Sequence, residues 1–159
     1  MNIWNIEKLK NDIKSKNLSE KDKFYYMFIN IILFTIVMDD SHYNTLKDFT
    51  VWDIISNTSG SIIEIIYIPC AFIANGANKG NDFLGKYFSI SFVVSIRFLL
   101  LLIPIVFIYI IFDLFITGGS EDVKNEVLDA DAYFSISFII WEIFMYIRVC
   151  KHIRDLKDF

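Results

Sequence analysis

Charged side chains inside long apolar stretches are the residues of this 159-residue sequence whose types and spacing could do chemistry. Glu64, Arg97 and Glu142 each interrupt an apolar run, and Asn30 is a weaker polar residue in a fourth run. One guanidinium can hydrogen bond to two carboxylates, and a buried charge is stable only when it is paired. Because two acids would share one base, one carboxylate could also take up a proton. These four residues therefore predict a polar, proton-sensitive cluster inside the fold.

A second polar pattern lies on the apolar run that contains Glu64. Polar and small residues follow one another there at steps of three and four, which places them on one side of a helix: Asp53, Asn57, Gly60, Ser61 and Glu64. Such a face could line a polar lumen or gate. Alternatively, it could be a packing face whose polar groups are satisfied by neighbouring helices. The sequence leaves both interpretations open.

Catalytic chemistry, by contrast, lacks its usual residues. The two histidines, His42 and His152, are expected on opposite sides of a membrane, so they cannot form one metal site or one catalytic triad. The motifs GxSxG, HExxH and GxxxxGKS/T do not occur. Cys70 and Cys150 lie in or beside apolar runs, where they are expected as small packing residues. We therefore expect a protein that is not an enzyme and that uses no metal or cofactor.

The composition indicates that the elements carrying these residues are surrounded by a membrane. Hydrophobic residues make up 55% of the chain, aromatic residues 17% and charged residues 21%, and the mean hydropathy is +0.46. The charges are concentrated in short stretches, unlike the polar covering of a soluble domain. The net charge of -4 and the pI near 5.1 argue against nucleic acid binding, which requires a basic surface. The aromatic residues expected as anchors at the membrane interface are Trp52, Tyr87, Tyr133 and Tyr146.

Four apolar segments predict four membrane-spanning helices, at about residues 19–39, 52–75, 86–116 and 132–151. Within the third, Phe98 to Phe112 contains no charged or amide side chain, so this helix has no face suited to water. The first helix can begin at Ser19, an N-cap residue with an acid three residues later. The predicted fold is an all-α, polytopic integral membrane protein whose four-helix bundle covers residues 19–151.

The basic residues indicate an orientation independently of hydropathy. Of the 15 basic residues, 12 fall on one side of a four-span bundle, two fall on the other side, and Arg97 lies within a span. The positive-inside rule therefore predicts that both termini are cytoplasmic. The basic residues of the predicted cytoplasmic side are Lys8, Lys10, Lys14, Lys16, Lys21, Lys23, Lys79, Lys86, Arg148, Lys151, Arg154 and Lys157.

The helical rise places the polar residues of the spans at one depth. Glu64 and Arg97 each lie 11 residues, or roughly 16 Å, from the expected cytoplasmic ends of their helices, and Glu142 lies roughly 13 Å from that end. Asn30 lies 11 residues beyond Ser19. We therefore predict that the polar cluster is near the middle of the membrane, where charged side chains are costly and usually functional.

The two ends of the chain are predicted to lie outside the spanning bundle. Apolar residues recur at helical spacing in residues 1–18, namely Ile3, Ile6, Leu9 and Ile13. They predict a short amphipathic helix, which either lies in the cytoplasmic interface of the membrane or packs under the bundle. Residues 152–159 are expected to form a basic cytoplasmic tail.

Together these features predict a small non-enzymatic integral membrane protein of the bacterial cytoplasmic (inner) membrane. The frequent Ile, Phe, Asn and Lys, which have A/T-rich codons, point to a bacterium of low GC content. The protein would act by interaction, as the immunity partner of a membrane toxin or as a membrane component of a defence system. The alternative is an oligomeric channel or permeabilising effector whose second span lines a path. The expected partners are the lipid bilayer and either further copies of the chain or another membrane protein.

Overall fold

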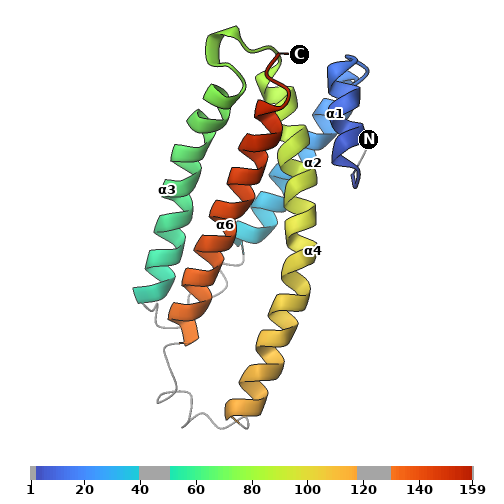
Figure 1. Ribbon diagram of the computed structural model, residues 1–159. Helices are drawn as coiled ribbons and strands as arrows, with labels where there is room; N and C mark the ends of the chain where they lie inside the picture. Colours follow the sequence, from blue (N-terminus) through green and yellow to red (C-terminus); the bar gives the residue numbers. More distant parts are fainter. Residues whose placement is uncertain (1–2, 40–50, 118–129, 159) are drawn as a thin grey trace.

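The computed structural model describes residues 3–39, 51–117 and 130–158, and every regular element in these ranges is helical (Figure 1). The prediction of an all-α protein is therefore confirmed. The elements are α1 (Ile6–Lys14), α2 (Glu20–Asp39), α3 (Val51–Ala74), the short 3-10 helix η1 (Ala77–Lys79), α4 (Phe83–Thr117) and α6 (Ala130–Arg154). The helices α2, α3, α4 and α6 coincide, within a few residues at each end, with the four apolar segments of the sequence.

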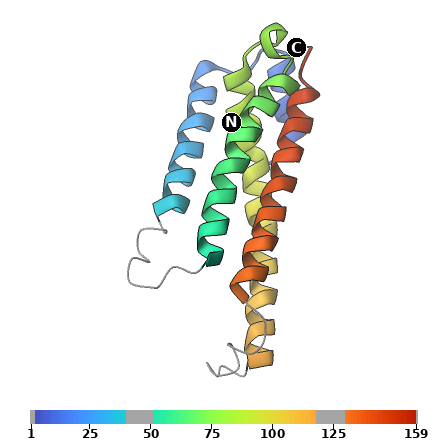
Figure 2. The ribbon, with the colours of Figure 1, turned by 90° about the vertical axis from the view of Figure 1, so that its left-hand side faces the viewer.

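The four long helices lie side by side, and the chain reverses direction from each of them to the next (Figure 1, Figure 2). Both ends of the chain consequently lie toward the same end of the bundle, which we call the terminal end. The main packing pairs are α3 with α6, α2 with α4 and α4 with α6, and α1 lies against α4.

The first turns of α1 and α2 are capped by side chains. Ser19 Oγ accepts a hydrogen bond from the backbone N–H of Asp22 at 3.1 Å, and its hydroxyl donates to the Asp22 carboxylate at 2.8 Å. The predicted start of the first long helix is thus confirmed. At the start of α1, the Asn5 side chain accepts a bond from the Lys8 backbone N–H at 3.0 Å. Both contacts satisfy an N–H that the helix itself leaves without a partner.

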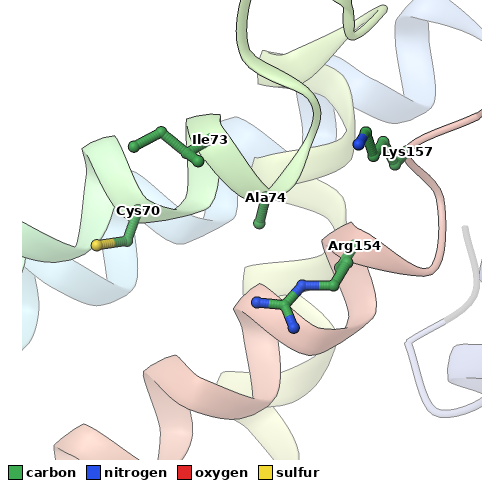
Figure 3. Close-up of a pocket in the computed structure, with 5 residues that line it drawn as sticks. All are labelled: Cys70, Ile73, Ala74, Arg154 and Lys157. Atoms are coloured by element: carbon green, nitrogen blue, oxygen red, sulfur yellow. The ribbon is translucent and has the colours of Figure 1, made fainter.

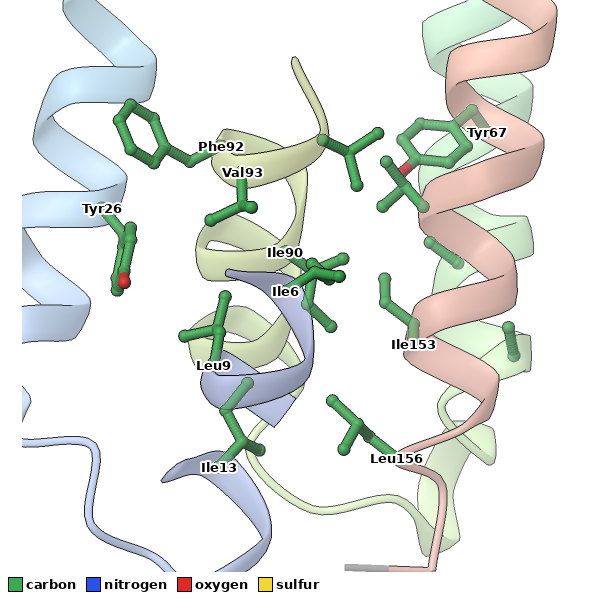
Figure 4. Close-up of a cluster of buried hydrophobic side chains, with 14 residues drawn as sticks. Ile6, Leu9, Ile13, Tyr26, Tyr67, Ile90, Phe92, Val93, Ile153 and Leu156 are labelled. Atoms are coloured by element: carbon green, nitrogen blue, oxygen red, sulfur yellow. The ribbon is translucent and has the colours of Figure 1, made fainter. Parts of the chain in front are cut away.

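The amphipathic helix α1 packs against the bundle with its apolar face. Ile6, Leu9 and Ile13 are all buried there (Figure 4). The apolar face of α1 therefore packs on the bundle, which is the second of the two positions that the sequence allowed, and an interfacial location of the helix stays a prediction. The physical reason is that α4 and α6 offer α1 a protein surface, so its apolar side chains need no lipid.

An ion pair holds α1 to the end of α6. Lys10 Nζ lies 2.8 Å from Asp155 Oδ2 and 3.2 Å from Glu7 Oε1, although Lys10 itself is buried. Burial opposes the charge of Lys10, but its hydrogen bonds to Asp155 and Glu7 outweigh that effect and raise its pKa. The bond from Lys10 lowers the pKa of Asp155 in turn. Both groups therefore stay charged over the neutral range, and the contact persists there.

The buried core is confined to the terminal end of the bundle. It combines side chains from α1, the start of α2, the end of α3, the first half of α4 and the last turns of α6 (Figure 4). Elsewhere, large apolar side chains are mostly exposed, as at Ile65 (72%), Phe107 (63%) and Phe144 (61%). Among the described residues, one helical segment, Phe83–Ile108, is long and apolar enough to cross a membrane, and Thr58–Ala74 is a shorter apolar helix.

A buried lysine joins three helices at the terminal end. Lys86, near the start of α4, is 2% exposed, and its ammonium donates to Asn75 Oδ1 at 3.2 Å and to the Leu156 carbonyl at 2.9 Å. Asn75 follows α3 directly and is completely buried, while Leu156 follows α6. Gly80 lies against this site, because a Cβ at that position would collide with the backbone carbonyl and side-chain amide of Asn75. The connection between α3 and α4 is therefore built around the lysine.

We predict that Lys86→Met lowers the free energy of unfolding by about 2 to 6 kcal/mol, because two buried acceptors lose their donor at about 1 to 3 kcal/mol each. Unfolding of the purified protein in detergent, followed by circular dichroism, measures the loss. Lys79→Met is the matched control, since Lys79 is exposed in the same connection, and it should change stability little. Equal effects of the two substitutions would contradict the role assigned to Lys86.

Candidate functional site

Two carboxylates meet across the interface between α3 and α6. Glu64 accepts a hydrogen bond from the Tyr146 hydroxyl at 3.3 Å, and the Glu142 carboxylate interacts electrostatically with Glu64. Glu142 reaches across to Gly60 on α3, where a Cβ would lie 3.7 Å from Glu142 Oε2. Both glutamates are half-buried. A Cβ at Gly60, one turn before Glu64, would make only ordinary van der Waals contact with that carboxylate, so Gly60 and Glu142 are direct neighbours in the interface between α3 and α6.

Three tyrosines form an aromatic cluster beside this carboxylate pair, which Tyr146 joins through its hydrogen bond to Glu64. Tyr67 is buried, and its ring stacks on that of Tyr146 with 4.0 Å between the ring centroids. The Tyr67 ring also lies 5.9 Å from the ring of Tyr87 on α4. Sequence reasoning expected Tyr87 and Tyr146 as interfacial anchors and missed their association with the acids. The available signal was spacing, because Tyr67 follows Glu64 by three residues and Tyr146 follows Glu142 by four.

Arg97 lies away from these acids, on the side of α4 that faces the N-terminus. Its Nε donates to the Trp4 carbonyl at 3.2 Å, and its Nη2 donates to the same oxygen. Within the described ranges, Arg97 forms no ion pair with Glu64 or Glu142. The arginine therefore holds the segment before α1 instead of neutralising the carboxylates.

Asn30 makes a third, separate polar contact. Its Nδ2 donates to the Phe88 carbonyl at 2.8 Å, which joins α2 to α4. The predicted single cluster of Asn30, Glu64, Arg97 and Glu142 is corrected accordingly: Asn30 lies between α2 and α4, the two glutamates lie between α3 and α6, and Arg97 contacts the segment before α1. Counting residues along a helix estimates depth, but the direction in which each side chain points depends on how the helices are rotated. Sequence alone did not supply those rotations.

The predicted polar face of the second span is only partly described. Glu64 faces α6, as given above, and Ser61 is exposed. The helix α3 includes Asp53 and Asn57, but their side chains lie outside the described ones. A continuous polar lumen along α3 consequently stays a prediction.

The carboxylate pair forms a polar contact between α3 and α6. Two like charges close together in a poorly solvated interface repel each other, and either a proton or a donor such as the Tyr146 hydroxyl reduces that cost. Within the described ranges, no group of three metal-ligating side chains occurs. No family model, curated protein or solved structure matches the chain. Its function therefore has to be argued from its own residues.

We predict that Tyr146→Phe and Glu64→Gln are energetically coupled. Tyr146→Phe alone should lower the stability in detergent by about 1 to 2 kcal/mol, because it removes a hydrogen bond to a charged group. Glu64→Gln should cost less, because it weakens that bond but also removes the repulsion between Glu64 and Glu142. The double variant should lose less than the sum of the two, as a double-mutant cycle measures. Tyr25→Phe, which removes a hydroxyl from a more exposed tyrosine, is the control. Strict additivity would show that the pair does not interact.

Proposed function

We propose that this chain is a small integral membrane protein of the bacterial cytoplasmic membrane, crossed by α2, α3, α4 and α6, that acts by binding another protein. The observation that carries its membrane position is the exposure of large apolar side chains over most of the bundle surface outside the terminal end. Monomeric soluble proteins rarely expose contiguous apolar surface of this extent. Lipid tails would cover it at no cost in hydrophobic free energy.

The segment Phe83–Ile108 supports this position most directly. Only 22% of its most apolar window is buried, whereas the central helix of a soluble protein would be covered by its neighbours. It starts far from the N-terminus, so it is not a signal sequence. Within the charge-free stretch of α4, three large apolar side chains are each more than half exposed, namely Leu101, Ile103 and Phe107.

The lengths of the other helices are compatible with crossing. At about 1.5 Å per residue, the 20 residues of α2 extend over about 30 Å, and the 24 and 25 residues of α3 and α6 extend over slightly more. A bilayer core is about 30 Å thick. The basic residues cluster at the terminal end, as at Lys23, Lys151 and Arg154, which supports a cytoplasmic location for both chain ends.

The way the bundle uses its polar side chains supports an interaction protein over a channel. Asn30, Lys86 and Arg97 donate to backbone carbonyls of other segments, and Glu64 accepts from Tyr146. Polar groups that bond within the bundle do not line a path for ions. The protein is accordingly proposed as an immunity partner of a membrane toxin or as a membrane component of a defence system.

We predict that Leu101→Lys strongly reduces the amount of protein in the membrane, because a lysine near the middle of a spanning helix costs about 3 kcal/mol. Leu84→Lys is the matched control: Leu84 is 65% exposed, but it lies at the terminal end beside Lys86, where a lysine is favoured. Membrane fractions washed with alkaline carbonate and quantified by immunoblotting measure both. In a soluble bundle the two exposed sites would tolerate lysine equally, within about 0.5 kcal/mol.

A second prediction concerns the partner. Tagged protein extracted from its native membranes in mild detergent should co-purify with one different protein in a fixed ratio. Reconstituted alone in liposomes, the wild type and Glu64→Gln should both give only the ion flux of empty vesicles. Recovery of the protein alone or only with itself, together with flux that Glu64→Gln reduces, would contradict this proposal and favour the channel.

A further inference from the structure

A hollow at the terminal end lies between the last turn of α3 and the end of α6 (Figure 3). Its volume is about 340 Å³, and its wall on the α3 side is formed by Cys70, Ile73 and Ala74. The other wall carries two basic side chains, Arg154 at the end of α6 and Lys157 in the turn that follows. The hollow therefore joins an apolar wall to a doubly cationic one.

The cationic wall is not neutralised by the acidic residue between its two members. Asp155 bonds instead to Lys10 of α1 at 2.8 Å, and that bond lowers the pKa of Asp155 and keeps its charge on the α1 side. The Lys157 side chain passes close to Gly76: its Cγ would lie only 3.3 Å from a Gly76 Cβ, so the absence of a side chain there leaves room for the lysine. Gly76 also has a φ of +99°, which favours glycine there.

The apolar wall continues along α3, away from the terminal end. Ile73 is 67% exposed, and Ile66, two turns earlier on the same helix, is 59% exposed. A ligand that fits both walls is amphipathic, with an anionic group at Arg154 and Lys157 and an acyl chain along α3. Guanidinium groups bind phosphates through two parallel hydrogen bonds, and basic pockets on the cytoplasmic side of membrane proteins hold anionic headgroups.

We propose that this hollow binds the headgroup of an anionic phospholipid of the cytoplasmic leaflet. The lipid phosphate bonds to Arg154 and Lys157, and one acyl chain lies against Ile73 and Ile66. This inference rests on the membrane position proposed above. A free phosphate would meet the same two cations, but it would leave the apolar wall exposed, so the lipid is the occupant that uses the whole surface.

The test uses the full-length protein in a neutral detergent. Short-chain phosphatidylglycerol, short-chain phosphatidylcholine and inorganic phosphate are titrated separately, and binding is followed by the rise in unfolding temperature and by native mass spectrometry. Phosphatidylglycerol should bind more tightly than the other two. The double substitution of Arg154→Gln and Lys157→Gln should weaken the binding of phosphatidylglycerol about tenfold or more, because it removes two positive charges that each attract the anionic headgroup.

Two control variants isolate the site. Lys8→Gln removes an exposed lysine on α1 and should leave phosphatidylglycerol binding unchanged. Ile73→Gln should weaken phosphatidylglycerol but not phosphate. Because Arg154, Lys157 and Ile73 are exposed, these variants should fold, which circular dichroism verifies. Equal affinity for the three probes, or equal affinity of all variants for phosphatidylglycerol, overturns the proposal.

Failure of this site is distinguishable from failure of the membrane position. If Leu101→Lys is excluded from membranes while all variants bind phosphatidylglycerol equally, only the lipid site is overturned. If Leu101→Lys is tolerated like Leu84→Lys, the membrane position is overturned, and the lipid site fails with it. Phosphatidylglycerol binding that requires Arg154, Lys157 and Ile73, in a protein whose Leu101→Lys variant does not insert, supports both.

Discussion

The buried ammonium of Lys86 is the constraint on which the terminal end of the bundle depends. A charge removed from water needs hydrogen-bond partners within the protein. The Lys86 ammonium donates to the Asn75 side chain after α3 and to the Leu156 backbone carbonyl after α6. Three helix ends are consequently fixed relative to one another. Gly80 has no side chain because Asn75 occupies that space. The core of Ile90, Ile153 and the apolar face of α1 forms around this fixed point.

The terminal end and the rest of the bundle differ in how far their apolar side chains are buried. At the terminal end, a buried core that includes Leu9, Ile90 and Ile153 excludes water, while Leu84 and Ile73 at the surface of that end are exposed. Along the rest of α3, α4 and α6, apolar side chains point outward. The stacked rings of Tyr67 and Tyr146 join α3 to α6, and the hydrogen bond from Asn30 to the Phe88 carbonyl joins α2 to α4.

Sequence reasoning recovered the features that depend on one helix and missed those that depend on two. Apolar runs and the Ser19 cap predicted the long helices closely, because hydropathy and capping are local properties. The contact of Arg97 with the Trp4 carbonyl was missed, because a count of residues estimates the position of a side chain along its helix but not the direction in which it points. Lys86 was expected as an ordinary basic residue of the cytoplasmic side, because nothing in its neighbours signals that Asn75 and Leu156 converge on it. The hydrogen bond from Lys86 to Leu156 joins residues that are 70 positions apart, and such a contact leaves no local pattern in the sequence.

The separation of Arg97 from Glu64 and Glu142 leaves the two carboxylates without the arginine as a neutralising partner. Had the arginine joined them, the three charges would have formed a closed structural unit with nothing left to bind. Instead, Arg97 donates to the Trp4 carbonyl, and the hydrogen bond to the Glu64–Glu142 pair comes from the Tyr146 hydroxyl. Two carboxylates between spanning helices would be costly, and apolar residues of similar size would stabilise the interface more. The contact between α3 and α6 therefore depends on the Tyr146 hydroxyl, which offsets part of the repulsion between Glu64 and Glu142.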